Sequence, residues 1–330
     1  MVRTLSLLLF APLLLISQAF NYSSWNVQLL SRINPDTSLN TTPVGNRYSG
    51  CWGWYQSNKN REYVISGAAN GTYFIDITNP QNPVVCDFVG GKKGCTWREI
   101  KTYQNYCYVA SDDAKPNTFQ IIDMQYLPDS VQLIHNSNSI FERGHTLWID
   151  QNKLYVGMTT FSTGSSPMSI FSLATPSAPV LLKRIEQDIS INLINQVHDM
   201  LVRNDTIYAS AGWQGLHILK YVPAQNTLQP LSTYASYPFA GYNHSSFLTQ
   251  NGKILMLGHN QVLEKNNPSM HGEYGVIQQY LAKEGKQSLK DATMGEIYLM
   301  NLPRLGSAGF DLFVPLAPLG MVADKLVAKN

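Results

Sequence analysis

The stretch RGHTLWIDQNKLYV, residues 143–156, has the pattern of a β-hairpin. Two runs rich in apolar, β-branched and aromatic residues flank a polar turn at Gln151 and Asn152, as expected for two antiparallel strands. His145 departs from the pattern, because it puts a titratable side chain at the start of the first strand. Hairpins of the same layout recur along the chain, so this stretch is one copy of a repeat.

The repeat has a regular period. The second strands of the successive hairpins are EYVIS (62–66), YCYVAS (106–111), KLYVGM (153–158), TIYASA (206–211) and KILMLG (253–258), and they start 44, 47, 53 and 47 residues apart. A period of about 40–50 residues with several short strands per unit is typical of β-propellers, in which each repeat forms one four-stranded sheet, or blade.

Each repeat supplies the strands of a complete blade. The expected inner strands are GCWGWYQ (50–56), CTWREIKTY (95–103), GHTLWID (144–150), VHDMLVR (197–203) and NHSSFLTQ (243–250). The expected third strands are YFIDIT (73–78), FQIIDM (119–124), MSIFSL (168–173), GLHILK (215–220) and EIYLMN (296–301). The predicted fold is all-β, a β-propeller of five to six four-stranded blades. A lone strand at residues 23–33 is a candidate to close the ring.

The N-terminus has the pattern of a secretory signal peptide. Residues 1–19 carry Arg3, an apolar run and a small-x-small ending at Ser17 and Ala19. The alternative is a membrane anchor, but the apolar run is shorter than the roughly 20 residues that a spanning helix needs. We therefore expect a secreted or cell-surface protein with no membrane span after the signal peptide is removed.

The rest of the chain divides into two regions. The propeller domain is expected over residues 20–301, with a long polar insertion at 260–294. Residues 302–330 form a C-terminal tail that is a candidate for an incomplete final repeat. The blade count and the completeness of the C-terminus stay open at this point.

Composition narrows the classes of function. Only 14% of the 330 residues are charged and the net charge is +2, with no basic face for a nucleic acid. The four cysteines, Cys51, Cys86, Cys95 and Cys107, predict two disulfides in an oxidising compartment, with three alternative pairings. Sequons that would make the protein a glycoprotein occur at Asn21, Asn40, Asn70, Asn204 and Asn243.

Several motifs resemble those of a known family. They are Trp52-Gly53-Trp54, Arg61-Glu62-Tyr63, the run from Gly71 to Pro80, and Trp97-Arg98-Glu99-Ile100-Lys101. On these motifs the chain resembles the choice-of-anchor B family, which is built from LVIVD-type repeats, over about residues 25–300. The resemblance implies a propeller exported to the cell surface or beyond, and it implies no established reaction. The chain departs from the family pattern after residue 301, where members continue into at least one more repeat.

The histidine that opens the first hairpin recurs. When the hairpins are aligned on their second strands, His145, His198 and His244 take the same position, and Arg98 takes it in the preceding repeat. Inner strands of a propeller run parallel around the channel, so equivalent positions form a ring at one mouth. Glu99 and Asp199 directly follow two of these positions and are expected on the opposite strand face, where either could orient an imidazole.

Three roles for this ring stay open. The histidines could bond the backbone of a neighbouring blade, or hold a divalent transition metal through His145, His198 and His244. With Arg98 they could instead bind an anion or small molecule. The predicted ligand-binding set is Trp97, Arg98, Glu99, His145, His198, Asp199 and His244. Trp97 and Trp213 could line the mouth, although core packing is the favoured interpretation of the tryptophans.

The predicted function is that of a binding module acting through the mouth of the central channel. Its ligand would be an extracellular carbohydrate, peptide or small molecule. The alternative is a metal-dependent hydrolase or lyase that uses the three histidines. No nucleotide-binding or nucleophile-elbow motif occurs, and the sequence assigns no catalytic residue. Whether the protein is an enzyme, and its oligomeric state, stay open.

Overall fold

The computed structural model describes residues 29–36, 47–236, 241–253 and 255–260. The signal peptide expected at residues 1–19 and the tail at 302–330 lie outside the described residues. So do the strand expected at 296–301 and all of the insertion except its first residue. No helix in the described part of the chain is long and apolar enough to cross a membrane.

The described chain is all-β, as predicted, and forms four antiparallel sheets of four strands and one of two. The first sheet contains β1 (Tyr48–Gln56), β2 (Arg61–Ala68), β3 (Gly71–Asp76) and β4 (Val84–Gly90). The second contains β5 (Glu99–Tyr103), β6 (Tyr106–Ala110), β7 (Phe119–Asp123) and β8 (Gln132–Ser137). The third contains β9 (Thr146–Asp150), β10 (Lys153–Phe161), β11 (Gly164–Ser172) and β12 (Val180–Arg184).

The fourth sheet contains β13 (Asp199–Arg203), β14 (Thr206–Ser210), β15 (Leu216–Val222) and β16 (Thr227–Tyr234), and the two-stranded sheet pairs β17 (Tyr242–Leu248) with β18 (Leu255–Asn260). A short 3₁₀ helix, η1 (Ile185–Gln187), follows β12. Within each sheet, strands adjacent in sequence are adjacent in space. Each repeat is therefore a simple meander.

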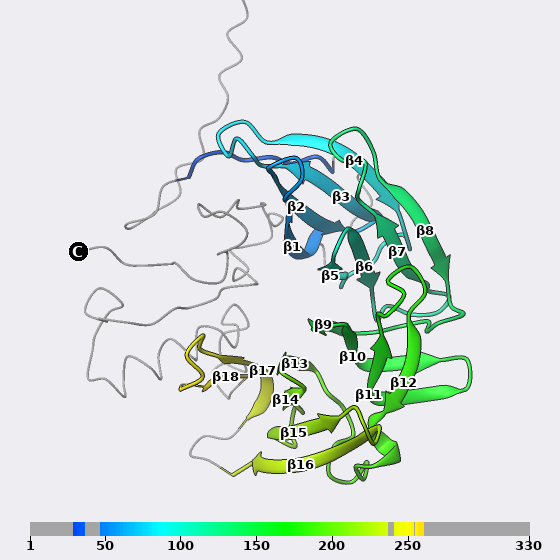
Figure 1. The fold of residues 1–330 in the computed structure, drawn as a ribbon, viewed down its shortest axis with the longest axis vertical. Helices are drawn as coiled ribbons and strands as arrows, with labels where there is room; N and C mark the ends of the chain where they lie inside the picture. The colour runs from blue at the N-terminus through cyan, green and yellow to red at the C-terminus, as the bar shows by residue number, and fades with distance from the viewer. Residues whose placement is uncertain (1–28, 37–46, 237–240, 254, 261–330) are drawn as a thin grey trace, which may run out of the picture.

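The sheets follow one another along an arc, with the first strand of each sheet on its inner side (Figure 1). Neighbouring first strands contact one another in chain order, from β1 to β5, β9, β13 and β17. The first strand of every repeat thus lies beside its counterpart in the next. This brings equivalent sequence positions together at the inner side of the arc.

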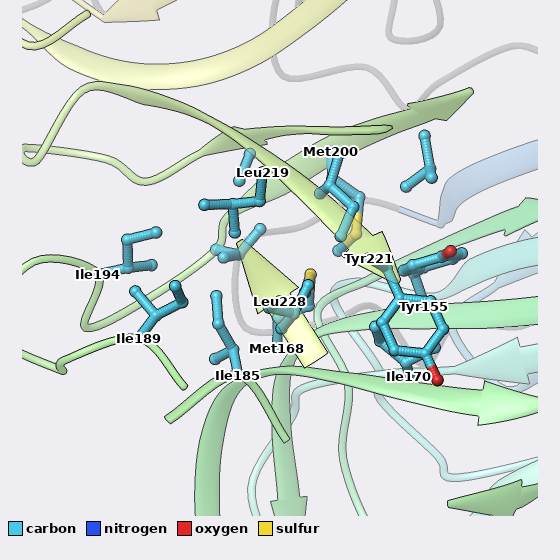
Figure 2. Close-up of a cluster of buried hydrophobic side chains, with 14 of the residues drawn as sticks. Tyr155, Met168, Ile170, Ile185, Ile189, Ile194, Met200, Leu219, Tyr221 and Leu228 are labelled. Atoms are coloured by element: carbon cyan, nitrogen blue, oxygen red, sulfur yellow. The ribbon is translucent and has the colours of Figure 1, made fainter. Parts of the chain in front are cut away.

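Alternation along the strands produces a hydrophobic core between every two sheets. On β6, the side chains of Cys107 and Val109 pack toward the first sheet, and that of Tyr108 packs toward the third. On β10, Leu154 packs toward the second sheet and Tyr155 toward the fourth. Figure 2 shows the cluster between the third and fourth sheets. Since both faces of a middle sheet are covered by neighbouring sheets, its central strands β6, β7 and β10 are buried at most positions.

The described part of the expected closing strand lies against the first sheet. Ile33 packs on the cluster formed by Val64, Ile75 and Ile77. The Ser31 hydroxyl donates a hydrogen bond of 2.6 Å to the Pro80 carbonyl. Residues 29–36 are thus anchored to the β2–β3 side of the arc.

The expected disulfides are not formed, since all four cysteines are free. Cys51 lies on β1 and Cys86 on β4, at opposite edges of one sheet. Three strand spacings of about 4.8 Å separate these edges by about 14 Å, and a disulfide needs Cα atoms within about 7 Å. The Cys95 thiol lies 2.8 Å from the Asp113 carboxylate, and Cys107 is part of the core between the first two sheets.

The sequons differ in exposure. The side chain of Asn243 is 0% exposed in β17, so this residue could not accept a glycan in this fold. Asn204 is exposed in the β13–β14 turn and Asn70 is half-buried in the β2–β3 turn. Asn21 and Asn40 lie outside the described residues.

The aromatic contact between the second and third sheets provides a test of this packing. The Phe141 ring is buried, with its centroid 4.2 Å from that of Phe119 and 5.4 Å from that of Phe171. We expect Phe141→Ala to lower the free energy of unfolding by about 3–5 kcal/mol in urea titrations, because it leaves a cavity between two sheets. The control, Tyr126→Ala in the β7–β8 turn, removes a ring that is 49% exposed and should cost about 1 kcal/mol or less. Equal losses would contradict this assignment of the core.

Candidate functional site at the inner-strand mouth

The strand register places one residue of each repeat at the same height. The residues in question are Arg98, His145, His198 and His244, and each immediately precedes an equivalent cross-strand pair. These pairs are Glu99–Ala110, Thr146–Gly157, Asp199–Ser210 and Ser245–Gly258. Because the first strands lie side by side, the four positions lie along one end of the inner strands, which we call the mouth.

The turns between the second and third strands reach the same mouth. The second strand of each sheet is antiparallel to the first, so it ends where the first begins. Asp112 follows β6 and Trp213 follows β14, each in such a turn. The mouth is therefore built from strand starts of one sheet and turns of its neighbours.

A chain of hydrogen bonds runs across four sheets at the mouth. The Asp112 carboxylate lies 2.5 Å from Nδ1 of His145. Nε2 of His145 lies 2.9 Å from Nε2 of His198, and Nδ1 of His198 lies 2.9 Å from the carbonyl oxygen of His244. We call this set the histidine chain. Each of its four members comes from a different sheet.

The acceptors of the histidine chain fix where its protons lie. A carbonyl oxygen only accepts, so Nδ1 of His198 carries a proton. Neutral His198 then accepts at Nε2, and Nε2 of His145 must donate to it. Nδ1 of His145 faces a carboxylate at 2.5 Å and donates as well, so His145 is an imidazolium.

The two imidazoles have opposite pKa shifts, in agreement with this assignment. Burial disfavours a charge on His145, but the hydrogen bond and charge of Asp112, helped by two further carboxylates, raise its pKa. Burial lowers the pKa of His198, and the positive charges of His244 and His145 add to the effect. His145 is thus the charged member of the pair and His198 the neutral one.

The three imidazoles lie close together, but their spacing does not match that of metal ligands. The ring centroid of His198 lies 4.3 Å from that of His145 and 4.2 Å from that of His244. Two nitrogens bound to one tetrahedral zinc ion would lie about 3.3 Å apart, whereas the Nε2 atoms of His145 and His198 are 2.9 Å apart. Among the described residues, no group of three or more His, Cys, Asp or Glu side chains is arranged to hold a metal ion.

Arg98 points away from the histidine chain, although it occupies the equivalent position. Its guanidinium is buried and donates to the carbonyl oxygens of Ala68 at 3.0 Å and Lys92 at 2.8 Å. Ala68 is the last residue of β2 in the first sheet, and Lys92 lies in the loop after β4. The side chain therefore joins the first two sheets.

Neither Glu99 nor Asp199 bonds an imidazole. Glu99 forms an ion pair with Lys101, whose ammonium lies 4.1 Å from the centroid of the Trp52 ring. Burial raises the pKa of Glu99, and Lys101 opposes the rise. The Asp199 carboxylate accepts from the Thr146 hydroxyl at 3.1 Å and from the backbone N–H of Met200 at 2.8 Å.

The role of orienting an imidazole belongs to Asp112, which was not among the predicted site residues. The only signal in the sequence is that Asp112 follows a second strand and so lies at the same mouth as the strand starts. Its 33-residue separation from His145 carries no local pattern that would link the two.

Two tryptophans at the mouth are exposed rather than packed. Trp52, Trp54 and Trp148 lie in or against the hydrophobic clusters, as the favoured interpretation required. Trp97 is 48% exposed and Trp213 is 76% exposed, so for these two the packing interpretation is wrong. Trp97 immediately precedes Arg98, and Trp213 lies in the β14–β15 turn.

Trp213 is connected to the histidine chain through a second ring. Its centroid lies 5.6 Å from that of Tyr242, which lies 5.4 Å from that of His198, both in edge-on contacts. Gly212 permits this arrangement, because its φ is +60° and a Cβ there would lie 2.6 Å from a Tyr242 ring carbon. Tyr242 was also missed from sequence, since no strand pattern singles it out.

The turn that carries Trp213 is held in place by Gln214. The amide oxygen of Gln214 accepts from the backbone N–H of Asn195 at 2.7 Å, and its amide nitrogen donates to the carbonyl of Asn192 at 3.1 Å. The loop before β13 is thereby fastened beside Trp213. These bonds fix the position of the turn that carries the Trp213 indole.

No protein-family model and no curated protein matches the chain. It is similar to the solved structure of a functionally unknown protein from Desulfotomaculum acetoxidans DSM 771, with 11% identity, a TM-score of 0.45, and 64% of this chain and 63% of that chain covered. It is also similar to a protein provisionally described as a 6-phosphogluconolactonase from Bacteroides uniformis ATCC 8492, with 12% identity, a TM-score of 0.44, and 65% of this chain and 62% of that chain covered. For the Bombyx mori GH32 β-fructofuranosidase BmSUC1 the identity is 9%, the TM-score is 0.39, and 68% of this chain and 57% of that chain are covered. The chain spans less than two thirds of each, and these similarities are too distant to assign a function.

The charge on His145 can be tested by removing its partner. We expect Asp112→Asn to lower the pKa of His145 by about 1–3 pH units, measured by NMR titration of the imidazole nitrogens, because the ring loses an opposite charge at hydrogen-bond distance. Since folding favours the protonated ring, the loss of stability should be about 1.5–3 kcal/mol below pH ~6.5 and should shrink as the pH rises through the folded pKa.

The control for this experiment is Asp129→Asn, which removes an exposed carboxylate from the β7–β8 turn. It should leave the titration of His145 unchanged. If Asp112→Asn and the control gave the same titration curve, His145 would not be held as an imidazolium by Asp112.

Proposed function

We propose that the protein is a secreted or cell-surface β-propeller of five to six blades that binds a ligand at the mouth of its central channel. Radial sheets with neighbouring first strands support the propeller architecture. The signal-peptide pattern of residues 1–19 and the resemblance to the choice-of-anchor B family support export. The histidine chain, Tyr242 and Trp213 form the centre of the proposed site.

The exposure of Trp213 is the observation that carries this proposal. An indole that is 76% exposed leaves most of its apolar surface in water, where a ligand can cover it. The turn and Gln214 keep it in that position at the edge of the mouth. Trp97, 48% exposed at the same mouth, offers a second apolar surface next to the second sheet.

Of the three expected ligand classes, carbohydrate fits the surroundings of Trp213 best. The segments 189–197 and 211–216 contain no charged residue, which favours an uncharged ligand. A sugar ring presents a C–H face that stacks on an indole, and its hydroxyls can bond a side-chain amide such as that of Gln196, which is hydrogen-bonded to Tyr242. A module of this kind binds and displays its ligand without any covalent chemistry.

The alternative function, a metal-dependent hydrolase or lyase, is favoured by one observation. The His198 ring lies within 4.3 Å, centroid to centroid, of both His145 and His244. Binding of a metal by these rings would require His145 and His198 to give up their mutual hydrogen bond. The proposed binding function leaves this hydrogen bond intact.

The binding proposal predicts a specific loss. Trp213→Ala should reduce retention of the protein on an array of uncharged oligosaccharides by about fivefold or more, if stacking of a sugar on the indole contributes about 1–3 kcal/mol, as stacking of a nucleic-acid base on an aromatic side chain does. Tyr126→Ala, which removes a 49% exposed ring from the β7–β8 turn at the other end of the sheets, serves as the control. Equal retention of both variants would contradict a site at Trp213.

The alternative function, which uses a bound metal, predicts a measurable metal content. If the histidines hold a metal, purified protein should contain about one transition-metal ion per chain, and a chelator should lower its melting temperature by several degrees. The binding proposal expects no such metal and an unchanged melting temperature. His145→Ala and His198→Ala should each abolish any bound metal if the alternative is correct.

A further inference from the structure

We propose that the ligand of this mouth is an amphiphile, an uncharged sugar joined to an alkyl or acyl chain, and that the chain lies on Ile191 and Leu193 beside Trp213. The inference rests on the proposed function and specifies the class of its ligand. It is based on two exposed aliphatic side chains in the loop before β13.

This loop has a buried side and an exposed side. Ile189 and Ile194 are buried in the core between the third and fourth sheets (Figure 2). Between them in the chain, Ile191 is 58% exposed and Leu193 is 41% exposed. The backbone N–H groups of Leu193 and Ile194 donate to the Ser190 carbonyl at 2.9 and 3.1 Å, which closes a tight turn. The buried isoleucines therefore anchor a turn that holds two aliphatic side chains in water.

The exposed side of the loop adjoins Trp213. The Gln214 amide nitrogen donates to the carbonyl of Asn192 at 3.1 Å. Asn192 stands between Ile191 and Leu193 in the chain. Gln214 directly follows Trp213, which is 76% exposed. The hydrogen bond thus joins the turn that carries the indole to the turn that carries the two aliphatic side chains. We call Ile191, Leu193 and Trp213 the apolar patch.

The segments that form the apolar patch suit an uncharged, apolar group. Residues 189–197 and 211–216 include no Asp, Glu, Lys or Arg. These segments therefore offer no attraction to an ionic group, whereas an apolar chain that covers them leaves water. Single exposed apolar side chains are common on soluble proteins. This patch differs because its three side chains adjoin one another at the proposed ligand site.

The size of the apolar patch favours a small ligand over a protein partner. A stable protein interface takes roughly 20–30 residues from each partner. The patch has three side chains, so it is far too small to be such an interface by itself. A single hydrocarbon chain has the dimensions of two or three aliphatic side chains.

The neighbouring hairpin favours a single chain over a bilayer. The Val197 N–H donates to the Pro167 carbonyl at 3.2 Å, so the β10–β11 hairpin stands beside the loop. This hairpin continues for four residues past the pair Gly157–Met168, or about 13 Å, to an exposed polar tip at 162–165. A flat bilayer would have to accommodate the polar tip next to the patch, whereas one flexible chain would not.

The chain should add affinity to a ligand that its sugar already positions. With the sugar on Trp213, the attached chain covers Ile191 and Leu193 without a second loss of translational and rotational freedom. Each methylene group that leaves water raises affinity by up to about fourfold. Two buried methylenes are therefore enough for a gain of at least about tenfold.

The full chain can be titrated by calorimetry with methyl and octyl glycosides of glucose, galactose and mannose, all kept monomeric. We expect the best octyl glycoside to bind at least tenfold more tightly than its methyl counterpart. Ile191→Ser combined with Leu193→Ser should reduce this gain to less than threefold and leave the affinity for the methyl glycoside unchanged. A double variant that keeps the wild-type gain would overturn the proposal.

The matched control is Leu133→Ser combined with Ile134→Ser. It replaces the same two residue types on β8, where they are 41% and 40% exposed, and it should keep the full gain. Both double variants change exposed side chains and should melt at the wild-type temperature. Ile191→Thr combined with Leu193→Thr provides a second polar pair if the serine variant does not fold.

An ether without a sugar separates this inference from the proposed function. Tetraethylene glycol monooctyl ether carries the octyl chain alone. If methyl glycosides do not bind, but the ether and the octyl glycosides bind equally and Ile191→Ser with Leu193→Ser abolishes both, the sugar assignment fails and the chain site stands. If methyl glycosides bind and the octyl chain adds nothing, the chain site is refuted and the proposed function stands. If no octyl compound binds, the chain site is refuted as well.

Two further results would assign the apolar patch to a different occupant and overturn the proposal. One is binding of the protein to phosphatidylcholine vesicles that Ile191→Ser with Leu193→Ser abolishes, which would indicate a bilayer. The other is a dimer in gel filtration that the same double variant dissociates, which would indicate a second copy of this chain. We expect neither.

Discussion

The structure depends on the need to bury both faces of each middle sheet. A four-stranded sheet that has large apolar side chains on both faces of its central strands cannot leave either face in water. Tyr108 packs on one neighbour and Cys107 on the other, and Leu154 and Tyr155 divide in the same way. Sheets that must each contact two others, and that are joined in sequence by short connections, stack side by side along an arc. Every first strand then lies next to its counterpart, and equivalent residues meet at the mouth.

This stacking explains the histidine chain. Strand starts from successive sheets converge at the mouth, where polar groups are partly removed from water and need partners. Asp112, His145, His198 and the His244 carbonyl satisfy one another in a fixed direction, from carboxylate through imidazolium and imidazole to carbonyl. Both nitrogens of His145 and of His198 are used in these bonds. The histidines therefore join neighbouring sheets.

The ligand surface proposed at the mouth lies on turns that a rigid scaffold of sheets holds in position, as is common for binding sites in proteins. The sheets fix the positions of the turns, and Gln214 together with Tyr242 fixes Trp213. An exposed indole on such a support loses little conformational entropy when it binds. The contacts from Trp213 through Tyr242 to His198 also join the proposed ligand surface to the histidine chain.

The sequence by itself determined the repeat, its strands and the alignment of Arg98, His145, His198 and His244. These follow from the alternation of apolar residues and from the spacing of turns, which are local properties of the chain. The tertiary structure decided what those residues touch. It turned Arg98 toward the carbonyls of Ala68 and Lys92, gave His145 a carboxylate 33 residues away, and left Trp213 exposed. It also placed Cys51 and Cys86 at opposite edges of one sheet, where they cannot pair. Such contacts depend on the paths of turns and on the packing between sheets, and the strand period does not encode them.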